Sequence, residues 1–165
     1  MDFQSFPLTT AALSRPQRNG GAANAKANRK ESRDRLHKVL LASGDRRERE
    51  HWAAHLSNSE YSLLSVEDGE AALQTILADR IDVVIAAVTM AKLDGLEMLR
   101  ALRGLSRPPA AILVAKGGRE IDRVYLKIAK LYGAAATYTQ PLDRKTLRSG
   151  LRAALGFRDS SVEED

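Results

Sequence analysis

Three histidines have the type and spacing that could bind a metal ion: His37, His51 and His55. His51 and His55 are four residues apart, so on a helix their two imidazoles would share one face. The chain contains no cysteine, and no further ligand pattern accompanies the pair. We therefore interpret these residues as surface histidines and predict no metal site.

The segment Ala115-Lys116-Gly117-Gly118 has the composition of a phosphate-binding loop. It lacks the glycine spacing of a nucleotide-binding fingerprint, so we predict no nucleotide and no other cofactor. The carboxyl ends of the predicted strands offer neither a nucleophile nor a general base. The sequence therefore predicts that the protein is not an enzyme.

Short apolar runs alternate five times with segments of helical periodicity. The predicted strands are residues 38–42, 61–66, 81–87, 111–115 and 135–139. The predicted helices are residues 45–57, 70–78, 95–105, 121–131 and 142–155, and the second is expected to bury Ala71, Leu73, Ile76 and Leu77. Such apolar runs are typical of strands buried on both faces of a parallel sheet. The alternation predicts an α/β fold, a doubly wound five-stranded parallel sheet flanked by helices.

The two ends of the chain carry opposite charge. Residues 1–36 hold seven basic and three acidic side chains and little apolar periodicity, so we predict a disordered basic arm. Residues 37–157 are the predicted domain, and residues 158–165 are an acidic tail. No apolar run approaches the roughly 20 residues of a membrane span, and the first residues lack the pattern of a secretory signal. We therefore expect a cytoplasmic protein with no membrane contact.

Five local motifs occur in the order and spacing of one known family. They are the strand 39–42, Val66-Glu67-Asp68-Gly69-Glu70-Ala71-Ala72-Leu73, Asp94-Gly95-Leu96-Glu97, Gly133-Ala134-Ala135 and Pro141-Leu142. Together they make residues 37–157 resemble the response-regulator receiver (CheY-like) family. The resemblance implies a flavodoxin-like fold and a bacterial role in two-component, phosphorelay signal transduction. The alternative is an ordinary α/β domain that carries similar local motifs.

The resemblance also implies a pocket in which receivers are phosphorylated on an aspartate at the end of the third strand. Here that position is Ala87, which has no oxygen to attack phosphorus. The family's other chemical positions are an acidic pair that holds magnesium, a hydroxyl and a lysine. Ser43, Gly44, Val114 and Gln140 occupy them. The chain thus resembles a degenerate pseudo-receiver, and we expect a signalling module that works without phosphorylation.

Three neighbouring positions yield structural expectations. The resemblance implies that the Gln140-Pro141 peptide bond is cis. The switch aromatic of the family is replaced by Thr137, and Tyr138 is expected on the opposite face of the strand because side chains alternate. Asp45, one residue beyond the replaced acidic pair, is expected to cap the first helix.

Partner binding is expected on the face that the fourth helix, fifth strand and last helix form in receivers. The candidate residues are Tyr125, Leu126, Lys127, Lys130, Tyr132 and Arg148. This assignment takes Val124, Ile128 and Leu131 to face the sheet and Leu126 to face outward. Exposed tyrosine beside basic side chains suits a protein-protein interface. Candidate partners are a histidine kinase, another response regulator or a second copy of the chain.

A second function stays open, because the basic arm could neutralise nucleic-acid phosphates. No aromatic residue lies between Arg15 and Arg35, so stacking on single-stranded bases is unsupported. The alternative to a partner-binding module is a small nucleic-acid-associated regulator that grips phosphates through its arm.

Overall fold

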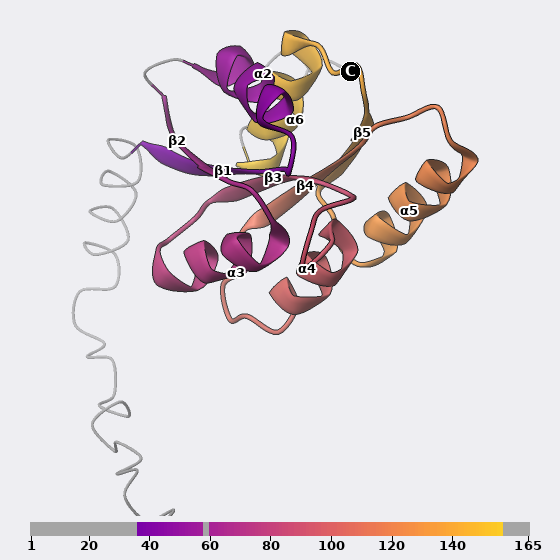
Figure 1. Ribbon diagram of the computed structural model, residues 1–165. Coiled ribbons are helices and arrows are strands. Elements are labelled where there is room, and N and C mark those ends of the chain that lie inside the picture. The colour runs from indigo at the N-terminus through magenta and orange to yellow at the C-terminus, as the bar shows by residue number, and fades with distance from the viewer. Residues whose placement is uncertain (1–35, 58–59, 157–165) are drawn as a thin grey trace, which may run out of the picture. The chain divides into compact units, whose positions relative to one another are not determined.

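The computed structural model describes residues 36–57 and 60–156, and Figure 1 shows how the elements are arranged. The strands are β1 (His37–Ala42), β2 (Tyr61–Val66), β3 (Val83–Ala87), β4 (Ala110–Ala115) and β5 (Ala136–Thr139). The helices are α2 (Arg46–Leu56), α3 (Gly69–Ala78), α4 (Gly95–Leu102), α5 (Glu120–Leu131) and α6 (Arg144–Ala154). The predicted acidic tail, and all of the predicted arm except Leu36, lie outside the described residues.

The five strands form one sheet in the order β2-β1-β3-β4-β5, and every strand pair is parallel. Figure 1 shows α2 and α6 on one face of the sheet, and α3, α4 and α5 on the other. The predicted doubly wound sheet is therefore confirmed. The strand order changes direction between β1 and β3, and open α/β sheets bind ligands beyond the carboxyl ends of the strands at such a switch point.

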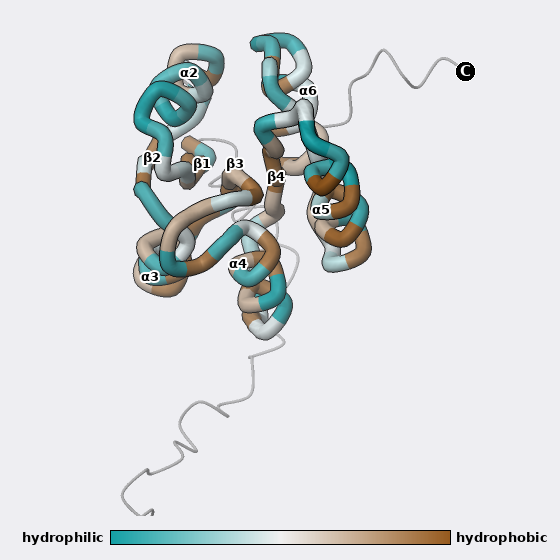
Figure 2. Tube along the Cα trace, turned by 45° about the vertical axis from the view of Figure 1, so that its right-hand side comes forward, coloured by the Kyte–Doolittle hydropathy of each residue, from teal (hydrophilic) through white to brown (hydrophobic). Residues whose placement is uncertain are grey.

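The core lies on both faces of the sheet. The central strand β3 is buried along its whole length, because helices cover it on both sides. Hydrophobic residues accordingly concentrate in the strands, while each helix mixes hydrophobic and hydrophilic positions (Figure 2). Trp52 and Leu56 of α2 are fully buried, as are Leu147 and Leu151 of α6, so these two helices close one face of the core.

Three elements differ from their predicted form. β3 begins at Val83, two residues later than predicted. The preceding Asp82 accepts the Lys38 backbone N–H through its carboxylate at 2.8 Å, while its own backbone N–H donates to the Lys38 carbonyl at 2.9 Å. α4 ends at Leu102, beyond which the backbone continues in tighter turns. In α3 the buried positions are 69, 72 and 76, so Leu77 lies one residue beyond the inward stripe and is 70% exposed.

Aspartate side chains cap four of the helices in the described part of the chain. The caps are Asp45 of α2, Asp68 of α3, Asp94 of α4 and Asp143 of α6. Each carboxylate accepts a backbone N–H that the helix itself leaves unpaired, which stabilises the first turn. The predicted cap at Asp45 is confirmed. No helix among the described residues is long and apolar enough to cross a membrane.

The connection from β5 to α6 begins with the Gln140-Pro141 peptide bond. This bond is cis, which confirms the expectation from the family resemblance. The Gln140 backbone N–H donates to the Ala115 carbonyl at 2.8 Å. Gln140 is therefore held beside the end of β4, at the same edge of the sheet as the end of β3.

Candidate functional site

The residues singled out from the sequence meet at the carboxyl edge of the sheet. Ala87 ends β3 and pairs with Val114 of β4 in the strand register. Ser43 follows β1 directly, and its N–H donates to the Val66 carbonyl at the end of β2. Gln140 follows β5. The fold thus brings these positions to one edge of the sheet, where Ala87 contributes a methyl group and Val114 an isopropyl group.

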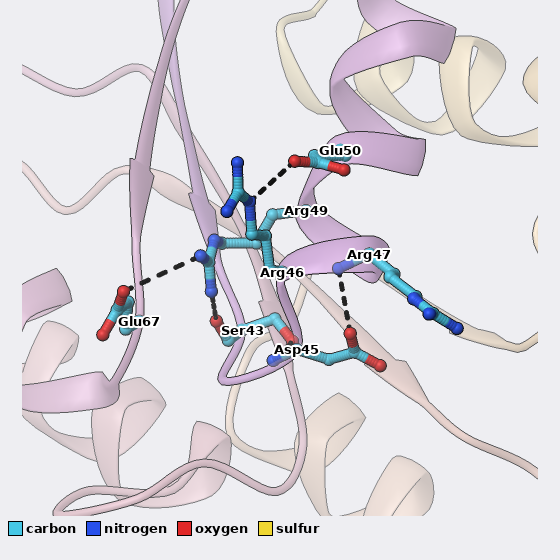
Figure 3. A network of polar contacts seen from close by, with 7 residues as sticks. All are labelled: Ser43, Asp45, Arg46, Arg47, Arg49, Glu50 and Glu67. Carbon is cyan, nitrogen blue, oxygen red and sulfur yellow. Dashed lines mark hydrogen bonds and ion pairs between the residues drawn. The ribbon is translucent and has the colours of Figure 1, made fainter.

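The polar groups that follow β1 are already engaged in local structure. The Ser43 hydroxyl accepts the backbone N–H of Asp45 at 3.1 Å. The Asp45 carboxylate accepts the backbone N–H of Arg47 at 2.9 Å, and Figure 3 shows it turned toward the start of α2. Asp45 therefore acts as a helix cap.

Arg49 lies next to Ser43, a contact that the sequence did not predict. Its guanidinium donates to the Ser43 carbonyl at 2.5 Å and lies 3.9 Å from the Glu67 carboxylate, as Figure 3 shows. The Arg49 side chain is largely buried, whereas Glu67 is exposed. A fixed cation therefore stands beside the end of β1, where a positive charge disfavours a second cation such as Mg²⁺.

Glu48 is the second residue that the sequence reasoning missed. It is only 9% exposed, and its carboxyl group interacts with the Gln140 side chain. Burial raises the pKa of Glu48, the nearby Asp45 charge raises it further, and Lys116 and the Gln140 side chain act in the opposite direction. The signal that could have revealed Glu48 is its spacing, since it lies four residues before Trp52 on the buried stripe of α2.

The Asp94-Gly95 motif acquires a physical reason in the structure. A Cβ atom at Gly95 would lie 2.7 Å from the Ala87 carbonyl oxygen and 3.1 Å from the Val88 Cα. The Gly95 N–H donates to the Val88 carbonyl at 2.8 Å. The start of α4 therefore packs directly against the backbone that follows β3, and only glycine allows this approach.

Comparisons with known proteins agree with this geometry. The family model of the response regulator receiver domain matches residues 39–152. The chain belongs to the response-regulator receiver family. The response regulator MprA of Mycolicibacterium vanbaalenii is 35% identical to this receiver over 120 residues, which make up 72% of this chain and 50% of the relative. MprA of Mycobacterium tuberculosis matches to the same extent, so this receiver spans about half the length of these curated relatives.

Solved structures show the same fold. The signal receiver domain of an HD domain-containing protein from Pseudomonas fluorescens has a TM-score of 0.67 and 24% identity, over 74% of this chain and 96% of that one. The chemotaxis response regulator CheY4 of Vibrio cholerae has a TM-score of 0.64 and 24% identity, over 73% of this chain and 100% of that one. These likenesses support the receiver fold.

The last strand of this receiver places its two central side chains on opposite faces. A Cβ atom at Gly150 of α6 would overlap the Tyr138 hydroxyl, so the Tyr138 ring packs on the α6 side of the sheet. Thr137 precedes it in the strand and therefore points to the opposite face. The expected division between Thr137 and Tyr138 is confirmed.

The expected orientation of α5 is wrong. Its buried residues are Asp122 and Ala129, whereas Val124 is 47% and Leu131 81% exposed. Leu126, expected to face outward, is half-buried and packs against the core. The buried Asp122 carboxylate forms an ion pair with Arg119 at 2.9 Å. Because the buried face of α5 begins with this charged residue, hydrophobic spacing in the sequence did not identify that face.

The remaining residues of the predicted partner face differ in exposure and in the element that carries them. Lys127 and Lys130 are exposed on α5, and Tyr132 is half-buried with the Arg103 guanidinium 5.9 Å from its ring. Tyr125 is half-buried against the core. Arg148 lies on α6, which covers the other face of the sheet (Figure 1). The exposed part of the predicted face is therefore carried by α5.

Proposed function

We propose that this receiver is a non-enzymatic signalling module that binds protein partners and is not phosphorylated. The observation that carries the proposal is the pocket at the carboxyl edge of the sheet. Ala87 stands at the position of the family's phosphoacceptor, and Gln140, at the position of its lysine, interacts with the buried Glu48. A methyl group offers no nucleophile, and an amide offers no positive charge to a phosphoryl group.

Magnesium binding lacks support for a related reason. Mg²⁺ in phosphoryl-transfer sites is held by carboxylates and phosphate oxygens. Among the carboxylates nearest the pocket, Asp45 caps α2 and Glu48 interacts with Gln140. Arg49 adds a positive charge beside Ser43. These local contacts support the proposal that this edge of the sheet does not bind magnesium.

Incubation with acetyl phosphate and Mg²⁺, followed by intact-mass measurement, tests the proposal. We expect no mass gain, whereas a receiver that retains its aspartate gains one phosphoryl group under the same conditions. A phosphoryl group that maps by peptide analysis to the pocket around Ala87 would contradict the proposal. The same assay with a histidine kinase as donor extends the test to enzymatic transfer.

Restoring the family's residues tests the network around Glu48. The five-site variant carries Ser43→Asp, Gly44→Asp, Ala87→Asp, Val114→Thr and Gln140→Lys. We expect it to label weakly, because Glu48 would pair with the introduced lysine and neutralise it. Adding Glu48→Leu frees that lysine and is expected to increase labelling. Equal labelling with and without the sixth substitution would show that Glu48 does not control the pocket.

Partner binding is the remaining part of the proposal. Receiver domains generally interact with histidine kinases in two-component systems, and this receiver exposes both cations and apolar side chains on α5. Lys127 and Lys130 lie on the same helix as the exposed Val124 and Leu131. We infer that α5 is the partner-binding element, with a histidine kinase, another response regulator or a second copy of the chain as its partner.

A further inference from the structure

Two histidines of α2 and one backbone carbonyl converge beside the start of α6. The Nε2 atoms of His51 and His55 are 2.9 Å apart, and the His51 Nε2 is 3.3 Å from the Leu142 carbonyl oxygen. The two rings meet edge to face, with centroids 4.2 Å apart and planes inclined by 73°. Leu142 lies in the connection that follows the cis peptide bond, ninety-one residues from His51 in the sequence. The tertiary structure therefore adds the Leu142 carbonyl to a histidine pair that the sequence already places on one helix face.

The spacing of these donors suits a transition-metal ion. Imidazole nitrogens bind Zn²⁺ at about 2.0–2.1 Å, so two nitrogens on one ion are separated by about 2.9 Å at a right angle and about 3.4 Å at a tetrahedral angle. The observed 2.9 Å lies at the start of this range. In the metal-free protein, one ring N–H donates to the other ring's nitrogen. A metal ion would replace that proton without a movement of α2.

The residues around the two histidines leave them accessible to solvent and limit the further protein ligands that an ion could use. His51 is exposed and His55 half-buried, so an ion can reach both from solution. Asp143 and Arg144 both interact electrostatically with His55, so one negative and one positive charge flank the site. No cluster of three or more His, Cys, Asp or Glu ligands occurs among the described residues. The Leu142 carbonyl is the protein group that could serve as a third ligand, and water would complete the coordination.

We propose that His51, His55 and the Leu142 carbonyl form a binding site for one divalent transition-metal ion. Two imidazoles with one carbonyl favour Cu²⁺, Ni²⁺ and Zn²⁺ over Mg²⁺ and Ca²⁺, which prefer oxygen ligands. The site lies on the α2–α6 side and does not depend on the proposed signalling function. The bound ion would join the middle of α2 to the start of α6, two elements that already pack together.

Isothermal titration of the full-length chain with Zn²⁺ tests the site, with each histidine replaced in turn by glutamine. We expect the wild type to bind one ion per chain. His51→Gln and His55→Gln should each weaken binding by at least about tenfold, a loss that even outer partners of metal ligands can cause. His37→Gln is the matched control, because His37 is the chain's third histidine and lies on β1. It should leave the affinity unchanged.

Two further readouts separate metal binding from a general effect on folding. Cu²⁺ electron paramagnetic resonance should show two equatorial nitrogens in the wild type and one in His51→Gln. Zn²⁺ should raise the Tm of the wild type and of His37→Gln, because an ion that binds the native state stabilises the native state. It should not raise the Tm of the variant that carries both His51→Gln and His55→Gln. Absence of one-to-one binding, or an equal loss in His37→Gln and His51→Gln, would overturn the proposal.

Discussion

Replacing Leu131 separates the stability of this receiver from its association with partners. Leu131 is the last residue of α5 and is 81% exposed, so only about a fifth of it is buried by the fold. Full burial of a leucine side chain contributes about 1.5–3 kcal/mol. Its contribution to the free energy of unfolding is therefore about 0.3–0.6 kcal/mol. Leu131→Ser should lower stability by only this amount, apart from the small difference in helix propensity.

The exposed part of Leu131 is available to a partner. Burying it completely would contribute about 1.2–2.4 kcal/mol to association, which corresponds to a change in Kd of roughly seven- to fiftyfold. Leu131→Ser should therefore weaken association far more than it weakens the fold. Leu77→Ser is the matched control, because Leu77 is 70% exposed near the end of α3. Its effect on stability should be similar, and its effect on association negligible.

Urea unfolding measures the first quantity, and two binding assays measure the second. Sedimentation equilibrium reports self-association, and titration reports the Kd for the kinase or regulator that cross-links to a photoreactive residue placed at Lys127. The reasoning is refuted if Leu131→Ser leaves both associations at the wild-type value. It is also refuted if Leu77→Ser impairs them equally, because the apolar surface of α5 would then have no specific role.

Three further predictions concern the pocket, the packing and the arm. Burial raises the pKa of Glu48, so its carboxyl group binds a proton more tightly in the native state than in the unfolded state. The free energy of unfolding therefore falls as pH rises through the folded-state pKa of Glu48. Urea unfolding from about pH 4 to about pH 7 should show the stability of Glu48→Gln increasing relative to the wild type as pH increases. Gly69→Ala places its methyl group against the Leu93 backbone and should lower the free energy of unfolding by about 1–3 kcal/mol. Gly118→Ala is the comparison: its methyl group would have no neighbour within 4 Å, so this variant measures only the strain of a left-handed backbone. Deletion of residues 1–36 should leave the Tm unchanged, since the composition of these residues predicts no packed core. If the full-length chain binds DNA in a salt-sensitive way and this deletion abolishes the binding, the nucleic-acid alternative is favoured.

Local patterns in the sequence were sufficient for the order and type of the elements. The apolar runs of β1, β3 and β4 are short and continuous, and aspartates mark the starts of α2, α3, α4 and α6. Both signals act within a few residues, so they can be recognised without the rest of the fold. The family's motifs also aligned the chain so that Ala87 was predicted at the phosphoacceptor position, and this assignment stays a prediction.

The register of α5 could not be predicted in the same way. Ile121, Val124, Ile128 and Leu131 have helical spacing, yet Asp122 and Ala129 occupy the buried positions. A charged residue is excluded from a core by its desolvation cost unless a partner compensates it. Arg119 provides that partner, three residues away, but only the packed structure shows that the Asp122 side chain of this pair is buried. Hydrophobic spacing alone therefore selected the wrong face.

By itself, the sequence determined the fold, because strands and helix caps depend on neighbouring residues, and the motif positions predicted which residues replace those of the family's pocket. Only the tertiary structure decided what occupies the pocket and what surrounds it. Glu48 meets Gln140 through the packing of α2 against the carboxyl edge of the sheet. His51 meets the Leu142 carbonyl because α2 and α6 share one face. Contacts between segments about ninety residues apart depend on the packing of whole elements, and local sequence carries no signal of that packing.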